Sequence, residues 1–220
     1  MKKYKLLALS IGLTLIFTAS AYARDWELWN SNLFTVPLTK KINYNILAEW
    51  RYKNDMNYNY LYKIETGPSY KINDYFDVAL WYIYQEKQGS NKMWDRVDLS
   101  YVDLVAKVPL KQLFDIKVTN RLRHQYDYDK AKSTIRDALK FQKSFQLMKN
   151  FDIAPYIQEE PFYDCKANRI VEHRSSAGLA FTFFKKYALN LAYMLNSKKA
   201  AGSSKWGYTN VLQANLNLKF

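Results

Sequence analysis

The sequence predicts an all-β fold, a closed antiparallel transmembrane β-barrel of about 12 strands with 10 as the alternative, and three features favour it. Apolar and polar residues alternate along runs of 11 to 16 residues, whereas strands of a soluble sandwich average about 5 or 6 residues. Aromatic residues collect at both ends of these runs, as at the two interfaces of a membrane. The chain ends in strict alternation on an aromatic residue, "LQANLNLKF".

The N-terminus has the pattern of an export signal. Three lysines precede an apolar run from Leu6 to about Ser20, and the small-residue pattern Ala21-Tyr22-Ala23 follows. A membrane anchor is the alternative, but the run is shorter than the roughly 20 apolar residues of a membrane-spanning helix. We therefore expect residues 1–23 to be a cleaved secretory signal peptide and residues 24–220 to form the barrel.

The first candidate strands lie in the N-terminal half. An irregular run at 26–38 precedes the clearest alternation, at 42–52, and runs at 58–72 and 76–84 follow. In the run at 94–108 the apolar residues change face after Tyr101. A β-bulge near Tyr101 and Val102 would keep Asp103 off the apolar face.

Six further runs complete the barrel, at 113–128, 134–147, 151–164, 168–184, 186–197 and 207–220. Longer polar connections alternate with tighter turns between the runs, as expected of a barrel with two different ends. The runs number 11, but a bacterial single-chain barrel with both ends in the periplasm has an even number of strands. We therefore favour 12 strands.

The last run carries a recognisable terminal pattern, in which one face holds Leu212, Ala214, Leu216, Leu218 and Phe220. It resembles the C-terminal assembly signal by which bacterial outer-membrane barrels are recognised by their assembly machinery. The resemblance implies a Gram-negative outer membrane, with Phe220 at the periplasmic end, the short turns facing the periplasm and the barrel assembly machinery as a partner during biogenesis.

Four stretches resemble landmarks of a bacterial outer-membrane barrel family known only as a domain of unknown function (DUF2490-like). They are "LWNSNLFTVPLTKKINYNILAEWRY", "NRLRHQYDY", "PYIQEEPFYD" and "NRIVEHRSSAGLAFTF". The resemblance covers nearly all of the chain from Arg24 to Phe220 and implies a barrel fold. It implies no activity and no catalytic residues.

Charge and cysteine content limit the partners. The chain has 33 Lys and Arg against 20 Asp and Glu, and the excess is +10 once the three signal lysines are removed from +13. For an exported protein we expect outer-membrane lipids, lipopolysaccharide phosphates or small anionic solutes as partners, and no nucleic acid. With Cys165 as the only cysteine and two histidines, we expect no internal disulfide, no metal site and no cofactor.

If the apolar faces point to lipid, a mixed but mainly basic set of residues lines the lumen: Glu49, Arg51, Lys63, Glu65, Lys71, Arg121, Arg123, Asp127, Arg136, Lys140 and Glu160. These residues could simply fill a small barrel and hold its strands in register. Alternatively Arg121 and Arg123, joined by Arg136, form a basic ladder. This ladder predicts a porin-like narrow channel or a binding barrel for small, possibly anionic, solutes.

An enzyme is the remaining alternative. His173 and Ser175 share the face predicted to meet lipid. Such a pair resembles the outer-membrane phospholipase, in which a serine attacks a lipid ester with a histidine as base. The rest of that enzyme's motif is missing, because Ser176-Ala177-Gly178 follows where Asn-Gly-Arg would be expected. We therefore expect no enzyme, and a phospholipase-like esterase is the less favoured alternative.

Overall fold

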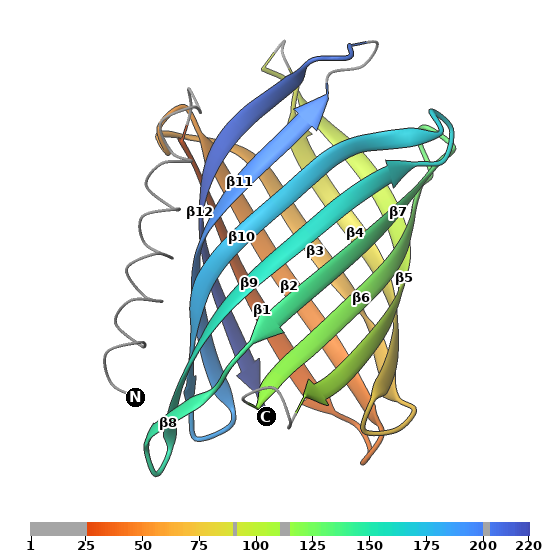
Figure 1. Cartoon of the computed structure of the whole chain (residues 1–220). Coiled ribbons are helices and arrows are strands. Elements are labelled where there is room, and N and C mark those ends of the chain that lie inside the picture. The colour runs from red at the N-terminus through yellow and green to blue at the C-terminus, as the bar shows by residue number, and fades with distance from the viewer. Residues whose placement is uncertain (1–25, 90–91, 111–114, 200–202) are drawn as a thin grey trace.

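The computed structural model describes residues 26–89, 92–110, 115–199 and 203–220, so the predicted signal peptide at 1–23 lies outside the described residues. Figure 1 shows a barrel of tilted strands. The strands are β1 (Trp26–Pro37), β2 (Ile42–Lys53), β3 (Tyr58–Lys71), β4 (Phe76–Gln88), β5 (Trp94–Leu110), β6 (Ile116–Asp127), β7 (Lys132–Gln142), β8 (Phe145–Met148), β9 (Phe151–Asp164), β10 (Arg169–Phe183), β11 (Tyr187–Lys199) and β12 (Trp206–Lys219). Within these ranges the chain forms no helix long and apolar enough to cross a membrane.

The predicted closed β-barrel is confirmed, and its closure has an unexpected polarity. Neighbouring strands pair antiparallel around the sheet, but β1 pairs with β12 in parallel, from Trp26 beside Asn210 to Thr35 beside Lys219. The first described residue, Trp26, and the last residue, Phe220, therefore lie at opposite rims. The expectation of an even number of strands in the closed sheet is wrong, because 11 strands close it.

The described residues form 12 strands, and 11 of them close the barrel. The twelfth, β8, continues the line of β7 along β9, because Gln142 pairs with Tyr156 and Phe145 with Ile153 on the same strand. The run predicted at 134–147 is thus one strand interrupted after Gln142.

Barrel size follows from the stagger of the strands. Register partners of Trp29 reach β5 at Asp95 in one direction around the barrel and at Pro109 in the other, an offset of 14 residues. An offset larger than the number of closing strands requires strongly tilted strands, at roughly 40° to the barrel axis. Such a barrel is wide enough to hold layers of long side chains and a cavity.

Alternation along each strand decides which side chains enter the lumen, because successive residues point to opposite faces of the sheet. The bulge predicted near Tyr101 and Val102 is absent: the register of β5 with both neighbours is continuous there. Tyr101 and Asp103 consequently both line the lumen, whereas Val102 and Leu104 are exposed on the outside. The sequence suggested a bulge because the lumen face of β5 begins with the apolar residues Val97, Leu99 and Tyr101, which resemble a lipid-facing run.

The outer surface forms an aliphatic band between two aromatic rims. The band is exposed and includes Ile64, Leu80, Leu104, Leu122, Ile157 and Leu191. Exposed aromatic side chains lie near the strand ends at the rim drawn at the top of Figure 1, the upper rim, among them Trp94, Tyr128 and Tyr208. Others lie toward the opposite, lower rim, among them Tyr75, Phe76, Phe184, Tyr187 and Phe220.

The two rims differ little in the length of their connections. The upper connections, at 54–57, 89–93, 128–131, 165–168 and 200–205, have four to six residues. The lower connections, at 38–41, 72–75, 111–115, 149–150 and 184–186, have two to five. The predicted contrast between long loops and short turns is therefore weak, and the clearest tight turns are the lower ones at 149–150 and 184–186.

Candidate functional site: a charged lumen

The barrel encloses a cavity of about 700 Å³ lined by residues from all 11 closing strands. Lys71, which ends β3 and pairs with Asp74, lies outside this lining, and the other residues predicted to face the lumen lie within it: Glu49, Arg51, Lys63, Glu65, Arg121, Arg123, Asp127, Arg136, Lys140 and Glu160. Among the described residues, the lining includes 11 basic and six acidic side chains. The cavity is therefore a strongly polar, net positive space.

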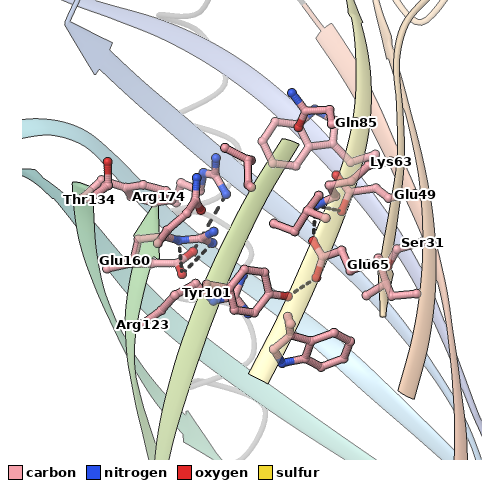
Figure 2. A pocket seen from close by; sticks show the side chains of 18 of the residues that line it. Ser31, Glu49, Lys63, Glu65, Gln85, Tyr101, Arg123, Thr134, Glu160 and Arg174 are labelled. Carbon is pink, nitrogen blue, oxygen red and sulfur yellow. Dashed lines mark hydrogen bonds and ion pairs between the residues drawn. The ribbon is translucent and has the colours of Figure 1, made fainter. Parts of the chain in front are cut away.

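An alternating chain of ion pairs crosses β2 and β3. Arg51 donates to Glu49, the Lys63 ammonium lies 2.8 Å from Glu49 and 2.6 Å from Glu65, and the Tyr101 hydroxyl donates to Glu65. Figure 2 shows Glu49, Lys63 and Glu65 on one side of the lumen, with Tyr101 reaching toward Glu65 from β5. Opposite charges alternate here, so this group is neutral once its two carboxylates meet two bases.

Arg123 has a different environment from that expected of a free ladder residue. Its Nε and Nη2 atoms donate to the two oxygens of Asp103 at 2.6 and 2.7 Å, and its guanidinium lies 3.4 Å from the centre of the Tyr101 ring. Only 7% of its side chain and 6% of the Asp103 side chain are exposed. This bidentate pair occupies the donors of Arg123 and links β5 to β6.

Glu160 lies among three arginines, Arg121, Arg136 and Arg174. Its Oε1 accepts hydrogen bonds from Arg121 at 2.8 Å and Arg136 at 2.9 Å, and Arg174 lies 4.0 Å from its Oε2. Arg174 also pairs with Glu172 at 2.6 Å. Three guanidinium groups thus share one buried carboxylate, so the cluster remains positive even after Glu172 is counted.

Trp29 joins these groups into one belt around the lumen. Arg51 lies 3.6 Å and Arg174 lies 4.9 Å from the centre of its ring. Through Trp29, the ion pairs of β10 therefore contact those of β2. The pairs of β2 and β3 extend to Tyr101 on β5, whose ring contacts Arg123 on β6, and Arg121 on the same strand pairs with Glu160 on β9. We call this set the lumen belt: Trp29, Glu49, Arg51, Lys63, Glu65, Tyr101, Asp103, Arg121, Arg123, Arg136, Glu160, Glu172 and Arg174.

Two cations of the lining, on β6 and β7, are not fully neutralised by a carboxylate. Arg121 shares Glu160 with Arg136, and its side chain is 31% exposed, although its Nε is buried without a hydrogen-bond partner. Lys140 lies 3.8 Å from the centre of the Tyr156 ring and, within the described part of the chain, has no carboxylate at ion-pair distance. Both face the cavity, so an anionic solute could approach them without displacing a buried carboxylate.

The lining divides into two unlike halves. On β1 to β5, the neutral half, three basic and three acidic residues lie among nine apolar or aromatic ones. On β6 to β11 with the connection at 128–131, the basic half, eight basic residues face three acidic and three apolar or aromatic ones. β12 adds three amides, Gln213, Asn215 and Asn217. The excess positive charge of the cavity thus lies on one side.

A smaller cavity of about 410 Å³ lies at the lower rim. Its charged lining residues are Asp74, Lys107, Asp115 and Lys117. Lys107 pairs with Asp77 beside this cavity. Counted over the described residues, this second space is balanced in charge, whereas the large cavity is net positive.

His173 and Ser175 lie on the outer face, as their phase predicts, because Glu172, Arg174 and Ser176 between and beside them line the cavity. Near the upper rim, His173 Nδ1 lies 3.1 Å from Oε1 of Glu159, whose register partner is Ser175. The ring of His173 also lies 5.5 Å from that of Trp206. The sequence had suggested no third group beside His173 and Ser175, and Glu159 is in position to orient the histidine.

Sequence reasoning missed several belt residues. Glu172 and Arg174 alternate with His173 and Ser175, so strand phase alone would have placed them in the lumen. Asp103 and Tyr101 were missed because of the expected bulge. Trp29 lies on an irregular run whose phase gave no clear signal.

The described residues contain no group of three or more His, Cys, Asp or Glu side chains able to hold a metal ion, and Cys165 is exposed. The geometry therefore defines a class of protein: a closed β-barrel with an aliphatic outer band and a basic lumen. A family model described as a protein of unknown function (DUF2490) matches residues 26–207, and the chain belongs to that family. No curated protein and no solved structure matches the chain.

Proposed function

We propose that the protein is an outer-membrane barrel that admits small anionic solutes into its lumen, as a narrow anion-selective channel or a binding barrel. The observation that carries this proposal is the lining of the large cavity, with 11 basic against six acidic residues. Fixed charge of one sign around a lumen sets the sign of the ions that enter it. Arginine also suits carboxylate and phosphate groups through its planar fork of donors.

The outer surface supports a membrane location. In lipid, backbone groups must pair within the protein, which a closed sheet achieves, and the exposed aliphatic band meets the acyl chains. Aromatic rims suit the two interfaces. With Phe220 at the periplasmic end, the upper rim would face outward, where Lys53 and Lys166 could meet lipopolysaccharide phosphates.

The last strand, β12, has features that suit a second partner, the barrel assembly machinery. Leu212, Ala214, Leu216 and Leu218 alternate with the cavity-lining amides of β12 and hence point outward, and Phe220 is 63% exposed at the lower rim. An outward apolar edge that ends on an accessible aromatic ring suits recognition by the barrel assembly machinery before the strand pairs with β1.

The proposal is tested by planar-bilayer recording of the refolded barrel in a salt gradient. We expect discrete current steps and a reversal potential that favours the anion. Reversing two lumen charges, in Arg121→Glu combined with Lys140→Glu, should lower the anion-to-cation permeability ratio by at least tenfold, because unit charges a few ångströms from an ion in water contribute about 1 kcal/mol each and about 1.4 kcal/mol is a factor of ten.

Lys149→Glu combined with Lys185→Glu is the matched control, because both lysines are exposed in lower turns outside the cavity lining. It should leave the ratio unchanged. Equal responses of the two double variants would contradict a lumen origin of selectivity. A folded barrel that passes no current and binds no acetate or inorganic phosphate would refute the proposal.

A second candidate function is an outer-membrane lipid hydrolase, which the position of Glu159 beside His173 favours. Glu159 would orient the imidazole, and His173 would take the proton of Ser175 as its oxygen attacks an ester carbonyl. The alcohol would leave with that proton, and water would then release the fatty acid from the acyl-serine. The site would lie near the upper rim, at the level of lipid ester groups.

This candidate predicts release of fatty acid from phospholipid vesicles that contain the barrel, with loss of at least a hundredfold in Ser175→Ala. Ser176→Ala is the matched control, since Ser176 is the neighbouring hydroxyl and points into the lumen. No release by the parent protein, or equal rates in both variants, would exclude the hydrolase.

A further inference from the structure

The large cavity has a basic side and a side with apolar residues, and a small inorganic anion would need only the basic side. Its volume, about 700 Å³, is that of a site for an organic ligand with many heavy atoms. A chloride or phosphate ion would contact the basic half alone. The partly exposed apolar side chains of the neutral half would then face water for no gain.

The apolar side of the cavity is a compact wall on β4 and β5. Ile83, Leu99 and Tyr101 form a buried cluster, and Trp81 and Val97 pack against it while remaining partly exposed. Their side chains line the cavity, so Trp81 and Val97 present apolar surface to whatever fills it. The indole N–H of Trp81 is buried without a hydrogen-bond partner, so the surface that this wall presents to the cavity is apolar.

The opposing side provides the anion contacts. Arg121 is partly exposed and shares its carboxylate with Arg136, Lys140 has no carboxylate at ion-pair distance among the described residues, and Arg136 and Arg174 add positive charge to the same lining. A carboxylate or phosphate here would accept hydrogen bonds without breaking the Arg123 pair with Asp103. Desolvated contacts of this kind fix the orientation of a ligand whose other end is apolar.

From this juxtaposition we infer that the lumen ligand is an amphiphilic anion, with its carboxylate or phosphate against Arg121 and Lys140 and its apolar body against Trp81 and Val97. The inference rests on the proposed function and narrows its solute class. Amphiphilic anions reach a barrel from two sources, the surrounding water and the bilayer, and both present the same chemistry.

Equilibrium dialysis against the barrel in lipid nanodiscs tests the inference, with empty nanodiscs subtracted. Octanoate and acetate carry the same headgroup and differ in the apolar chain. Octanoate should bind at least tenfold more tightly than acetate, because only its chain can reach the apolar wall. Palmitate incorporated in the nanodisc bilayer should displace octanoate if the bilayer is the source, and should leave it bound if the source is water.

Variants separate the two sides of the cavity. Arg121→Gln should weaken both anions about fivefold, whereas Val97→Asn should weaken octanoate about fivefold and leave acetate unchanged. Lys149→Gln, outside the cavity, should change neither. Circular dichroism and migration of the unheated barrel on gels check that each variant is folded.

Octanoate that binds no more tightly than acetate, in a barrel that still prefers anions in bilayer recordings, would overturn the inference and leave the proposed function standing. Octanoate binding that survives both Arg121→Gln and Val97→Asn would place it outside the lumen and also overturn the inference. Absence of current together with absence of binding by either anion would refute the proposed function itself.

Discussion

The neutral half and the basic half of the lumen face each other across one cavity, yet they use charge in different ways. In the neutral half, Lys63 lies between Glu49 and Glu65, and Arg51 also pairs with Glu49. In the basic half, Arg121, Arg136 and Arg174 share Glu160. Ion pairs in which each charge has a partner hold strands together, whereas cations that share one carboxylate can still attract an anionic solute. The contrast separates structural charges from those available for function.

The boundary between the halves provides the sharpest test of this contrast, because Arg121 and Arg123 lie two residues apart on β6. Arg123→Gln should lower the free energy of unfolding by about 3–5 kcal/mol, since it leaves the buried Asp103 carboxylate without its cation. Arg121→Gln should cost about 1 kcal/mol or less, because Glu160 keeps Arg136 and the site is partly exposed. Urea unfolding in lipid vesicles, followed by circular dichroism, measures both.

A double replacement supplies the control for Arg123. Arg123→Met combined with Asp103→Leu removes both charges and should recover most of the lost stability, because an apolar pair of similar volume often replaces a buried ion pair without loss. Equal costs for Arg121→Gln and Arg123→Gln would contradict the division into structural and functional charges.

Much of the barrel could be predicted because alternation is a local property of the chain. The run at 42–52, with Glu49 and Arg51 opposite Trp50 and Tyr52, predicts a strand and its lumen face at once, and the structure has β2 at Ile42–Lys53. Closure could not be predicted in the same way. The parallel pairing of β1 with β12 depends on how many strands the whole sheet contains, and no single run encodes that number.

Strand phase could predict which charged residues face the lumen, but not which acidic residue pairs with which basic one. Strand phase placed Arg121, Arg123 and Arg136 inside, but which carboxylate each one meets depends on stagger between strands far apart in sequence. Arg123 meets its direct register partner Asp103 on the neighbouring strand β5, whereas Arg121 reaches Glu160 of β9 across β7. Apolar residues in the lumen also concealed the phase of β5, because an apolar side chain can face either lipid or a packed lumen wall.

A smaller effect is expected where the two halves meet through an aromatic ring. Trp29 lies between Arg51 of the neutral half and Arg174 of the basic half, and it packs with Met194 and Val211. Replacement by leucine removes the ring and the indole hydrogen bond to Glu27, whereas replacement by phenylalanine removes the hydrogen bond and keeps a ring. The difference in unfolding free energy between the two variants therefore reports the contacts of the ring.

We expect Trp29→Leu to be less stable than Trp29→Phe by about 1 kcal/mol, the usual size of a partly desolvated cation–π contact. The difference should shrink when Arg174→Gln is added to both variants, because one of the two cations is then absent. Urea unfolding of the four proteins gives this coupling directly. A difference that persists unchanged without Arg174 would mean that Trp29 only fills space beside Met194, and that the two halves are coupled through the backbone of the sheet.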